Sequence, residues 1–274
     1  MLCLREASQT VISARDLVKK FGDLTAVKSI SFEVQRGEIF AFLGPNGAGK
    51  TTTIKMLTTL LKPTSGSIEL DGLNPVTQQS EARKRFGIVF QDPSLDDELT
   101  AWENMDFHGT LYSVPRKLRH TRTEQLLKLF ELWERRNDPV KQFSGGMKRR
   151  LEIARSLLHT PKIIFLDEPT IGLDPQTRNQ LWNHVKKLNE EEQVTVFLTT
   201  HYMEEAEKVA RRIAVIDHGV IVAQGSPEEL KQQTGADTLE GAFLALTGSS
   251  IRDQDASGID QMRNMARAWR GSRR

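Results

Sequence analysis

A glycine-rich octapeptide constrains the fold of this chain more than any other feature of its sequence. Residues 44–51, Gly-Pro-Asn-Gly-Ala-Gly-Lys-Thr, fit the pattern G-x-x-x-x-G-K-[ST]. They follow a continuous apolar run of strand length at 39–43, and they overlap the start of residues 50–61, where apolar residues recur at helical spacing until Pro63 ends the pattern. Glycines let the backbone wrap a phosphate chain, and a helix N-terminus supplies unpaired N–H groups. The sequence therefore predicts a phosphate-binding loop between a strand and a helix.

This loop gives its last two residues specific roles. Lys50 is expected to reach the β- and γ-phosphates of a nucleotide, and the hydroxyl of Thr51 is expected to bind Mg²⁺. A glycine-rich turn that fits the pattern by chance is the alternative, and the strand–helix setting argues against it.

Two acidic residues, Asp167 and Glu168, follow a second buried-strand candidate at 163–166. This order places them at the carboxyl end of a strand, where open α/β sheets bind their ligands. Asp167 is predicted to support Mg²⁺, and Glu168 is predicted to polarise the water that attacks the γ-phosphate. Two acids that merely begin a loop before Pro169 are the alternative.

The long interval between the phosphate loop and Asp167 contains an inserted helical part. Strand signals vanish between about 100 and 158, and helix signals begin there with a capping-box pattern from Thr100 to Glu103. Small GTPases and nucleoside kinases have no need of such an insertion. Within it, residues 143–147, Phe-Ser-Gly-Gly-Met, open a helix, and two glycines at a helix N-terminus make a second anion site. Alone, this short motif would usually mark only a helix cap.

The remaining patterns predict an α/β fold. Further strands are expected at 11–17, 29–34, 67–70, 194–198, 213–216 and 220–223, and a helix is expected at 175–188. The alternation of strand, helix and strand from 163 to 198 implies a parallel sheet. We expect a phosphate-loop NTPase core with a parallel sheet, an N-terminal antiparallel β-subdomain and an inserted helical subdomain at about 95–160. The glutamates at 190–192 are expected to form a solvated loop.

Composition excludes several classes of protein. The 274 residues include 38 Lys and Arg against 36 Asp and Glu, so the net charge of +2 provides no field that would attract nucleic acid. The single cysteine, Cys3, excludes an internal disulfide and a site of several cysteines, which favours a reducing compartment. No apolar run approaches the roughly 18 residues of a membrane span, and the charged first residues do not resemble a signal peptide.

The order of the motifs points to a family. The phosphate loop, Ser144-Gly145-Gly146, the acidic pair and His201 after a buried strand together resemble the ATP-binding cassette of ABC transporters, and the resemblance covers roughly residues 11–225. It implies an ATPase of which two copies associate head to tail. Each of two ATP molecules would lie between the phosphate loop of one copy and the Ser-Gly-Gly motif of the other.

The resemblance also implies roles for single residues. Gln91 is similar to the glutamine that senses Mg²⁺ and contacts the membrane partner, and His201 to the switch histidine on the γ-phosphate. Asp174 is similar to the acid of the loop that crosses the dimer, and Phe21 to the aromatic residue that stacks on adenine. The alternatives are a solvated loop residue for Gln91, a helix cap for His201 and a core residue for Phe21.

The expected site residues fall into three groups. Glu168, His201 and Gln91 are expected to act in hydrolysis, and Thr51, Gln91 and Asp167 are expected to bind Mg²⁺. ATP is expected to contact residues from both copies, namely Phe21, Gly44, Pro45, Asn46, Gly47, Ala48, Gly49, Lys50, Thr51, Thr52, Ser144, Gly145, Gly146, Met147 and Asp174.

Departures from the commoner cassette pattern indicate a branch of the family. Phe143 and Met147 replace a leucine and a glutamine, and Gly172-Leu173-Asp174 replaces a version with serine and alanine. These features and residues 238–248 are similar to the exporter branch typified by daunorubicin-type drug-resistance ATPases, in which the permease is a separate chain. Within 238–248, Gly-Ala at 241–242 stands where that branch favours an acidic residue and valine.

The resemblance implies a subunit that powers export of a small hydrophobic molecule, drug or lipid from the cytoplasmic side of the cell membrane. Its expected partners are an integral-membrane permease and a second copy of itself, without nucleic acid. A soluble cassette ATPase associated with ribosomes or nucleic acid is the alternative, although such proteins usually carry two cassettes or long coiled coils. The expected domains are a cassette at 1–225, a helical extension at 226–248 and a basic tail at 249–274, which is either amphipathic and lipid-binding or solvated.

Overall fold

A six-stranded sheet carries the elements that surround the phosphate loop. The chain is seen in a computed structural model, which describes residues 10–248. The strand order is β5 (Phe86–Val89), β6 (Ile163–Asp167), β7 (Thr195–Thr200), β3 (Ile39–Leu43), β8 (Arg212–Asp217) and β9 (Val220–Gly225). Neighbours from β5 to β8 are parallel, whereas β9 is antiparallel to β8. The predicted parallel sheet and its closing pair of strands are confirmed.

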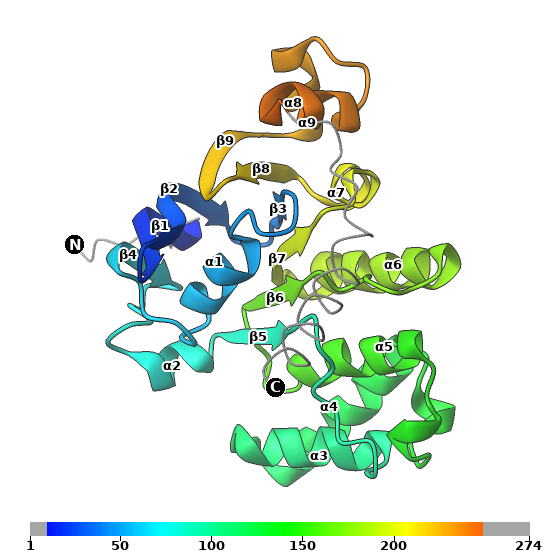
Figure 1. Cartoon of the computed structure of the whole chain (residues 1–274). Helices are drawn as coiled ribbons and strands as arrows, with labels where there is room; N and C mark the ends of the chain where they lie inside the picture. The colour runs from blue at the N-terminus through cyan, green and yellow to red at the C-terminus, as the bar shows by residue number, and fades with distance from the viewer. Residues whose placement is uncertain (1–9, 249–274) are drawn as a thin grey trace, which may run out of the picture.

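A second, antiparallel sheet packs against this one. Its order is β2 (Leu24–Gln35), β1 (Thr10–Phe21) and β4 (Ser65–Leu70). Phe32 of β2 joins the two sheets, because its ring lies 5.9 Å from that of Phe40, 5.3 Å from that of Phe42 and 5.8 Å from that of Phe197. These rings belong to one buried apolar cluster shared by the two sheets. Figure 1 shows the antiparallel strands β1, β2 and β4 on one side of the six-stranded sheet.

The helices between β5 and β6 form the predicted helical part. They are α3 (Ala101–Leu111), α4 (Arg116–Leu129), the 3₁₀ turns η1 (Trp133–Arg135) and η2 (Val140–Gln142), and α5 (Gly145–Ser156). The predicted capping box is present, since Glu103 N donates to Thr100 Oγ1 at 3.1 Å and Thr100 N donates to Glu103 Oε2 at 2.8 Å. One apolar cluster runs from Leu166 of β6 into these helices, so they share a core with the sheet.

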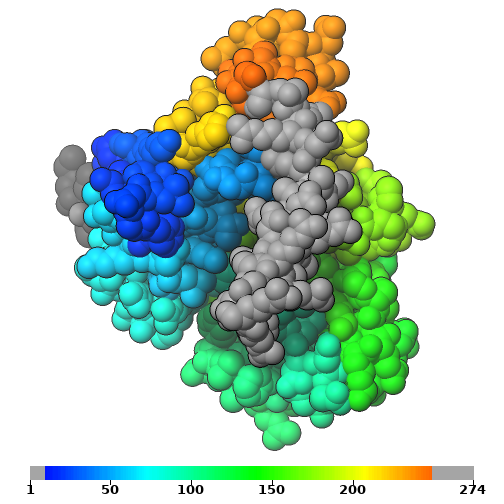
Figure 2. All heavy atoms as spheres, viewed as in Figure 1, coloured from blue at the N-terminus to red at the C-terminus, as the bar shows by residue number. Residues whose placement is uncertain are grey.

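The other helices cover the sheet and extend it. They are α1 (Lys50–Leu57), α2 (Gln79–Arg83), α6 (Pro175–Glu192), α7 (Met203–Val209), α8 (Pro227–Thr234) and α9 (Leu239–Thr247). Figure 2 shows α8 and α9 at the end of the molecule beside β9. Within residues 10–248 the structure contains no helix that is both long and apolar enough to cross a bilayer. Cys3 and the predicted basic tail lie outside the described residues.

Two helix boundaries differ from the predicted ones. Helix α1 ends at Leu57, four residues early, because Thr59 adopts a left-handed φ of 68°, and Leu60 is consequently exposed. Helix α6 continues past 188 to Glu192, so the glutamates at 190–192 are solvated but helical, and the prediction of a loop was wrong. Glutamate suits a helix interior well, and the chain turns only at Gln193, whose φ of 54° is left-handed.

Candidate nucleotide-binding site

Residues 44–49 form a tight loop between the carboxyl end of β3 and the start of α1. A Cβ atom on Gly44 would lie 2.3 Å from Ile216 O, and one on Gly49 would lie 2.8 Å from Ala26 O. Gly49 also has a φ of 108°, which a residue with a side chain rarely adopts. Glycine is required here because the loop backbone packs directly on β8 and β2.

The loop borders a cavity of about 320 Å³. Its lining residues come from the loop, from α1, from the start of β2 and from the segments that follow β5 and β6: Ala26, Asn46, Gly47, Gly49, Lys50, Thr51, Thr52, Gln91, Glu168 and Ile171. The other predicted loop residues support this wall from behind. Lys50 Nζ donates to Gly44 O at 2.7 Å and Pro45 O at 3.1 Å, and Ala48 O accepts from Gly219 N at 3.0 Å.

Asp167 lies at the carboxyl end of β6, where the sequence places it. Its Oδ1 accepts from Thr51 Oγ1 at 3.2 Å and from Thr199 Oγ1 at 2.6 Å. Burial raises the pKa of Asp167, and the two hydroxyl donors oppose this rise by stabilising the charged form. The carboxylate and the Thr51 hydroxyl therefore face the same point beside the phosphate loop.

Glu168 lies between the side chains of Lys50 and His201. Its Oε1 is 3.1 Å from Lys50 Nζ and its Oε2 is 3.0 Å from His201 Nδ1. Burial alone would raise the pKa of Glu168, but the hydrogen bond with His201 and the charge of Lys50 lower it to about 2. Burial lowers the pKa of Lys50 against the opposing charge of Glu168. Lys50, Glu168 and His201, which are far apart in sequence, thus form one contact network. His201 is not a helix cap, because Tyr202 is the N-cap residue of α7.

Gln91 follows β5 and lines the cavity. Its main chain is held by Arg149 of α5, which donates to Phe90 O at 2.6 Å and to Gln91 O at 2.8 Å. Arg149 is itself buried and pairs with Glu152 at 3.0 Å. The helix that begins at the Ser-Gly-Gly motif therefore holds the Gln91 loop in place.

Phe21 lies at the end of β1 with 45% of its surface exposed, so it is not a core residue. Lys19 Nζ lies 5.1 Å from the centre of its ring. The ring is not part of the wall of the 320 Å³ cavity.

The Ser-Gly-Gly motif and Asp174 lie apart from this cavity. Ser144 caps α5, since its Oγ accepts from Met147 N at 3.3 Å. Asp174 caps α6, with Oδ1 accepting from Thr177 N at 3.0 Å and Oδ2 from Thr177 Oγ1 at 2.6 Å. Neither Gly145 nor Gly146 lines the cavity. A single chain thus brings together the phosphate-loop half of the predicted site but not the Ser-Gly-Gly half.

Sequence reasoning missed three buried polar residues near the site: Thr199, Arg149 and Glu205. Thr199 both donates to Asp167 and accepts from Glu168 N at 3.0 Å. The signal that could have identified it is the pair of threonines at 199–200, which follow the apolar run at 196–198 and directly precede His201. Arg149 and Glu205 act through contacts with distant segments, for which no local pattern exists.

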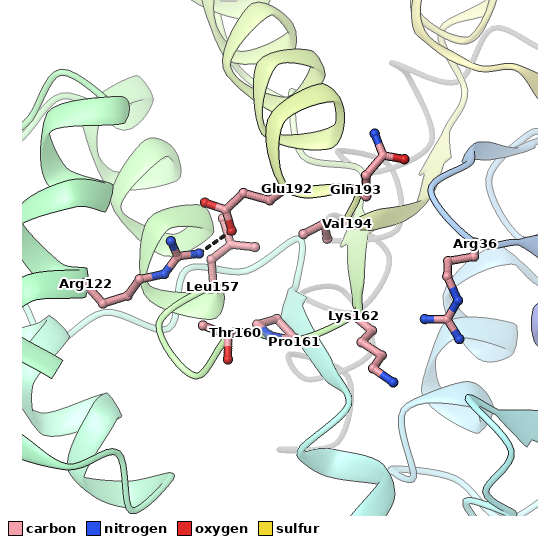
Figure 3. A pocket seen from close by; sticks show the side chains of 9 residues that line it. All are labelled: Arg36, Arg122, Leu157, Thr160, Pro161, Lys162, Glu192, Gln193 and Val194. Atoms are coloured by element: carbon pink, nitrogen blue, oxygen red, sulfur yellow. Dashed lines mark hydrogen bonds and ion pairs between the residues drawn. The ribbon is translucent and has the colours of Figure 1, made fainter. Parts of the chain in front are cut away.

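A second cavity, of about 290 Å³, lies at the opposite, amino ends of β6 and β7. In Figure 3 an ion pair between Arg122 and Glu192 closes one side, while Arg36 and Lys162 stand on the other. Both of these cations pair with Asp71, at 2.8 and 2.9 Å. No predicted site residue lines this cavity, and its charges are already paired among the described residues.

Comparison with a family model, with curated relatives and with solved structures points to the same kind of protein in each case. The family model described as "ABC transporter" matches residues 27–171. The chain is 41% identical to a daunorubicin resistance ATP-binding protein of Streptomyces coeruleorubidus, covering 89% of this chain and 81% of that protein. It is also 41% identical to a linearmycin resistance ATP-binding protein of Bacillus subtilis (strain 168), covering 89% of this chain and 76% of that protein. Among solved structures, a dimeric post-hydrolysis state of an ATP-binding cassette bound to ADP and Pi matches with a TM-score of 0.70 and 31% identity, over 78% of this chain and 98% of that chain.

Proposed function

The chain belongs to the ATP-binding proteins of ABC transporters, and we propose that it powers export of a small hydrophobic molecule, drug or lipid through a separate membrane permease. As a member of this family it is an ATPase. The observation that carries the proposal is the contact of Glu168 with both Lys50 and His201 beside the phosphate loop. Two relatives are named as daunorubicin and linearmycin resistance proteins, and this favours a drug-like cargo for the present chain.

In the proposed site, residues 44–52 hold the phosphates of ATP, and the exposed ring of Phe21 is available to stack on adenine. Glu168 orients the attacking water and accepts its proton, while His201 holds the Glu168 carboxylate in place. Replacing Glu168 by Gln is expected to lower the hydrolysis rate by about 10²- to 10⁴-fold while ATP binding persists. Hydrolysis at the wild-type rate would show that another group is the base.

Mg²⁺ fits the residues at the end of β6. Thr51, Asp167 and Gln91 offer hydroxyl, carboxylate and amide oxygens, which are the hard donors that Mg²⁺ prefers. Within residues 10–248 no cluster of three or more His, Cys, Asp or Glu is arranged to hold a metal. This agrees with an ion bound through one carboxylate and the substrate phosphates. When bound, the ion would neutralise charge on the β- and γ-phosphates.

We propose that two copies complete the site. The Ser-Gly-Gly motif and Asp174 lie outside the cavity of their own chain, so they are available to the nucleotide of a partner chain. Because both halves are present in this sequence, a symmetric homodimer is the simplest assembly. The free protein should be mainly monomeric and should dimerise when ATP bridges the two faces.

Light scattering tests this assembly on the Glu168→Gln variant. A dimer is expected with ATP and Mg²⁺ but not with ADP. Gly145→Asp, added to this variant, should block closure by repelling the γ-phosphate, whereas the neutral Gly145→Asn should permit it. Gly145 suits this test, because a Cβ there meets only Leu173 Cδ2 at 4.0 Å. A dimer that persists in ADP, or that forms equally with Asp and Asn, would contradict the ATP-bridged mechanism.

An exposed apolar surface on the helical part supports a protein partner. Phe107 and Leu111 of α3 are 61% and 66% exposed, and Leu118 of α4 is 52% exposed. Phe107 and Leu111 lie four residues apart on one face of α3, and exposed apolar side chains that adjoin in this way commonly mark an interaction site. We propose that the permease contacts this surface, to which the Gln91 loop is joined through Arg149 on α5.

Cell fractionation tests the partnership. The protein is expected to follow the membrane fraction only when its permease is co-expressed, and Phe107→Asp is expected to release it. Cofractionation with polysomes in high-Mg²⁺ gradients, with no response to a permease, would favour a ribosome-associated ATPase instead.

A further inference from the structure

A buried carboxylate on α7 joins the two loops that carry Glu168 and His201. Glu205 is 4% exposed, and both its oxygens accept from Thr170 Oγ1, at 2.7 and 2.8 Å. Its Oε2 also accepts from Thr200 Oγ1 at 3.3 Å. Thr170 lies two residues after Glu168, and Thr200 directly precedes His201. Movement of either loop therefore acts on the same carboxylate.

Arg178 of α6 extends this network to the loop at 172–174. Its Nε lies 3.2 Å from Glu205 Oε1, and its Nη2 donates to Leu173 O at 3.3 Å. Its guanidinium also lies 4.4 Å from the centre of the Tyr202 ring, which in turn is 4.1 Å from the ring of His201. One arginine thus contacts the segment before Asp174, the Glu205 carboxylate and the neighbour of His201.

This arrangement is poorly explained by stability alone. The Glu205 side chain is 5% exposed and that of Arg178 is 25% exposed, and such a pair gains little over apolar residues of similar size, because the Glu205 charge must be removed from water. The two side chains are instead placed where three functional loops meet. The hydrogen bonds that Glu205 accepts from Thr170 and Thr200 fix the position of these loops more effectively than apolar contacts would, because hydrogen bonds are directional.

We propose that Glu205 and Arg178 are positioning residues that make the Glu168, His201 and 172–174 loops move together. This inference rests on the proposed dimer, in which the 172–174 loop of one copy faces the nucleotide of the other. A displacement of His201 at one site would then pass through Tyr202, Arg178 and Glu205 to the loop facing the second site. The consequence is positive cooperativity between the two ATP sites.

The test measures the ATPase rate of the full-length protein against ATP concentration. The wild-type Hill coefficient is expected to exceed 1, with two as its upper limit for two sites. Glu205→Gln keeps the shape of the side chain but removes its charge, and it should reduce the coefficient to about 1. Arg178→Met should do the same, and the double variant should have no further effect, because both changes break one coupling.

Glu207→Gln is the matched control. Glu207 lies on the same helix, but it pairs at the surface with Lys231 of α8, at 2.7 Å. This variant should retain the wild-type rate and Hill coefficient. Melting temperatures of all variants separate coupling from loss of fold, and Arg178→Met carries the test if Glu205→Gln does not fold.

Three results would overturn the inference. The first is a wild-type Hill coefficient of 1, and the second is an unchanged coefficient in the folded Glu205→Gln or Arg178→Met variants. The third is a rate that falls only in proportion to the folded fraction, which would indicate a purely structural role. Failure of the dimer itself is detected separately, because light scattering with ATP would then show only monomer for the Glu168→Gln variant.

Discussion

Besides lowering the hydrolysis rate, replacing Glu168 by Gln should remove a contribution to the free energy of unfolding that is lost in acid. The carboxylate is 7% exposed and lies between Lys50 and His201, at 3.1 and 3.0 Å. Glutamine has nearly the same shape but carries no charge and cannot titrate. The variant therefore isolates what ionisation of this one group contributes to folding.

The size of the effect follows from the pKa of Glu168. Despite burial, His201 and Lys50 lower this pKa from 4.5 to about 2. At 1.36 kcal/mol per pKa unit, the shift corresponds to about 3 kcal/mol of folding free energy. Because the folded-state pKa lies below that of the unfolded chain, this stabilisation is present above pH 4.5 and is lost as the pH falls towards 2. About 2 kcal/mol of it should disappear between pH 6 and pH 3.

Urea unfolding of the two proteins at pH 6 and pH 3 measures this quantity. The difference in unfolding free energy between wild type and Glu168→Gln should shrink by about 2 kcal/mol at the lower pH, since all other acids titrate in both proteins. Glu190→Gln, on the exposed last turn of α6, is the control and should keep the wild-type pH dependence. An equal difference at both pH values would refute the reasoning, because Lys50 and His201 would then not hold the carboxylate ionised.

Three further predictions test other parts of the structure. Arg149→Met should reduce the unfolding free energy in urea by about 3 kcal/mol, because it leaves the buried Glu152 unpaired; a loss below about 1 kcal/mol would contradict the assigned pairing. Gly146→Ala should cost about 1–3 kcal/mol, because its Cβ would lie 2.3 Å from Thr177 Cγ2. Thr177→Ser, which removes that methyl group, should restore most of the loss, and no recovery would place the strain elsewhere. Phe21→Ala should weaken binding of a fluorescent ATP analogue about tenfold with little change in melting temperature, since the ring is exposed; unchanged affinity would exclude stacking on adenine.

Much of the fold could be predicted because its strongest signals are local. The run at 39–43 is apolar at every position and is buried throughout as β3. The capping box at Thr100 and the helix start at Ser144 depend on residues three positions apart, which are visible in the sequence. The ends of α1 and α6 are harder to predict from the sequence. Left-handed residues, Thr59 and Gln193, terminate these helices without glycine or proline at the turn.

The site was predictable only where a motif contains the contact. Lys50 and Thr51 belong to one contiguous pattern, so their place at the helix N-terminus followed from it. The bond from Thr199 to Asp167 joins residues 32 positions apart, and pairing of parallel strands is what brings them together. Arg149 reaches Gln91 across 58 positions. Contacts between residues so far apart in the sequence depend on how whole helices and strands pack. A single sequence contains no periodic pattern that predicts them.

If Glu168 is the base, as we propose, Lys50 provides a physical reason for it to accept a proton only when substrate is bound. The Lys50 ammonium donates to Gly44 O at 2.7 Å and pairs with Glu168 at 3.1 Å. With a pKa of about 2, a carboxylate is a weak proton acceptor. On the proposed mechanism, the γ-phosphate of ATP competes with Glu168 for the ammonium, because both are anions within its reach. As the ammonium turns to the phosphate, Glu168 loses one of the two contacts that lower its pKa, and it becomes a stronger proton acceptor beside the phosphate that is to be attacked.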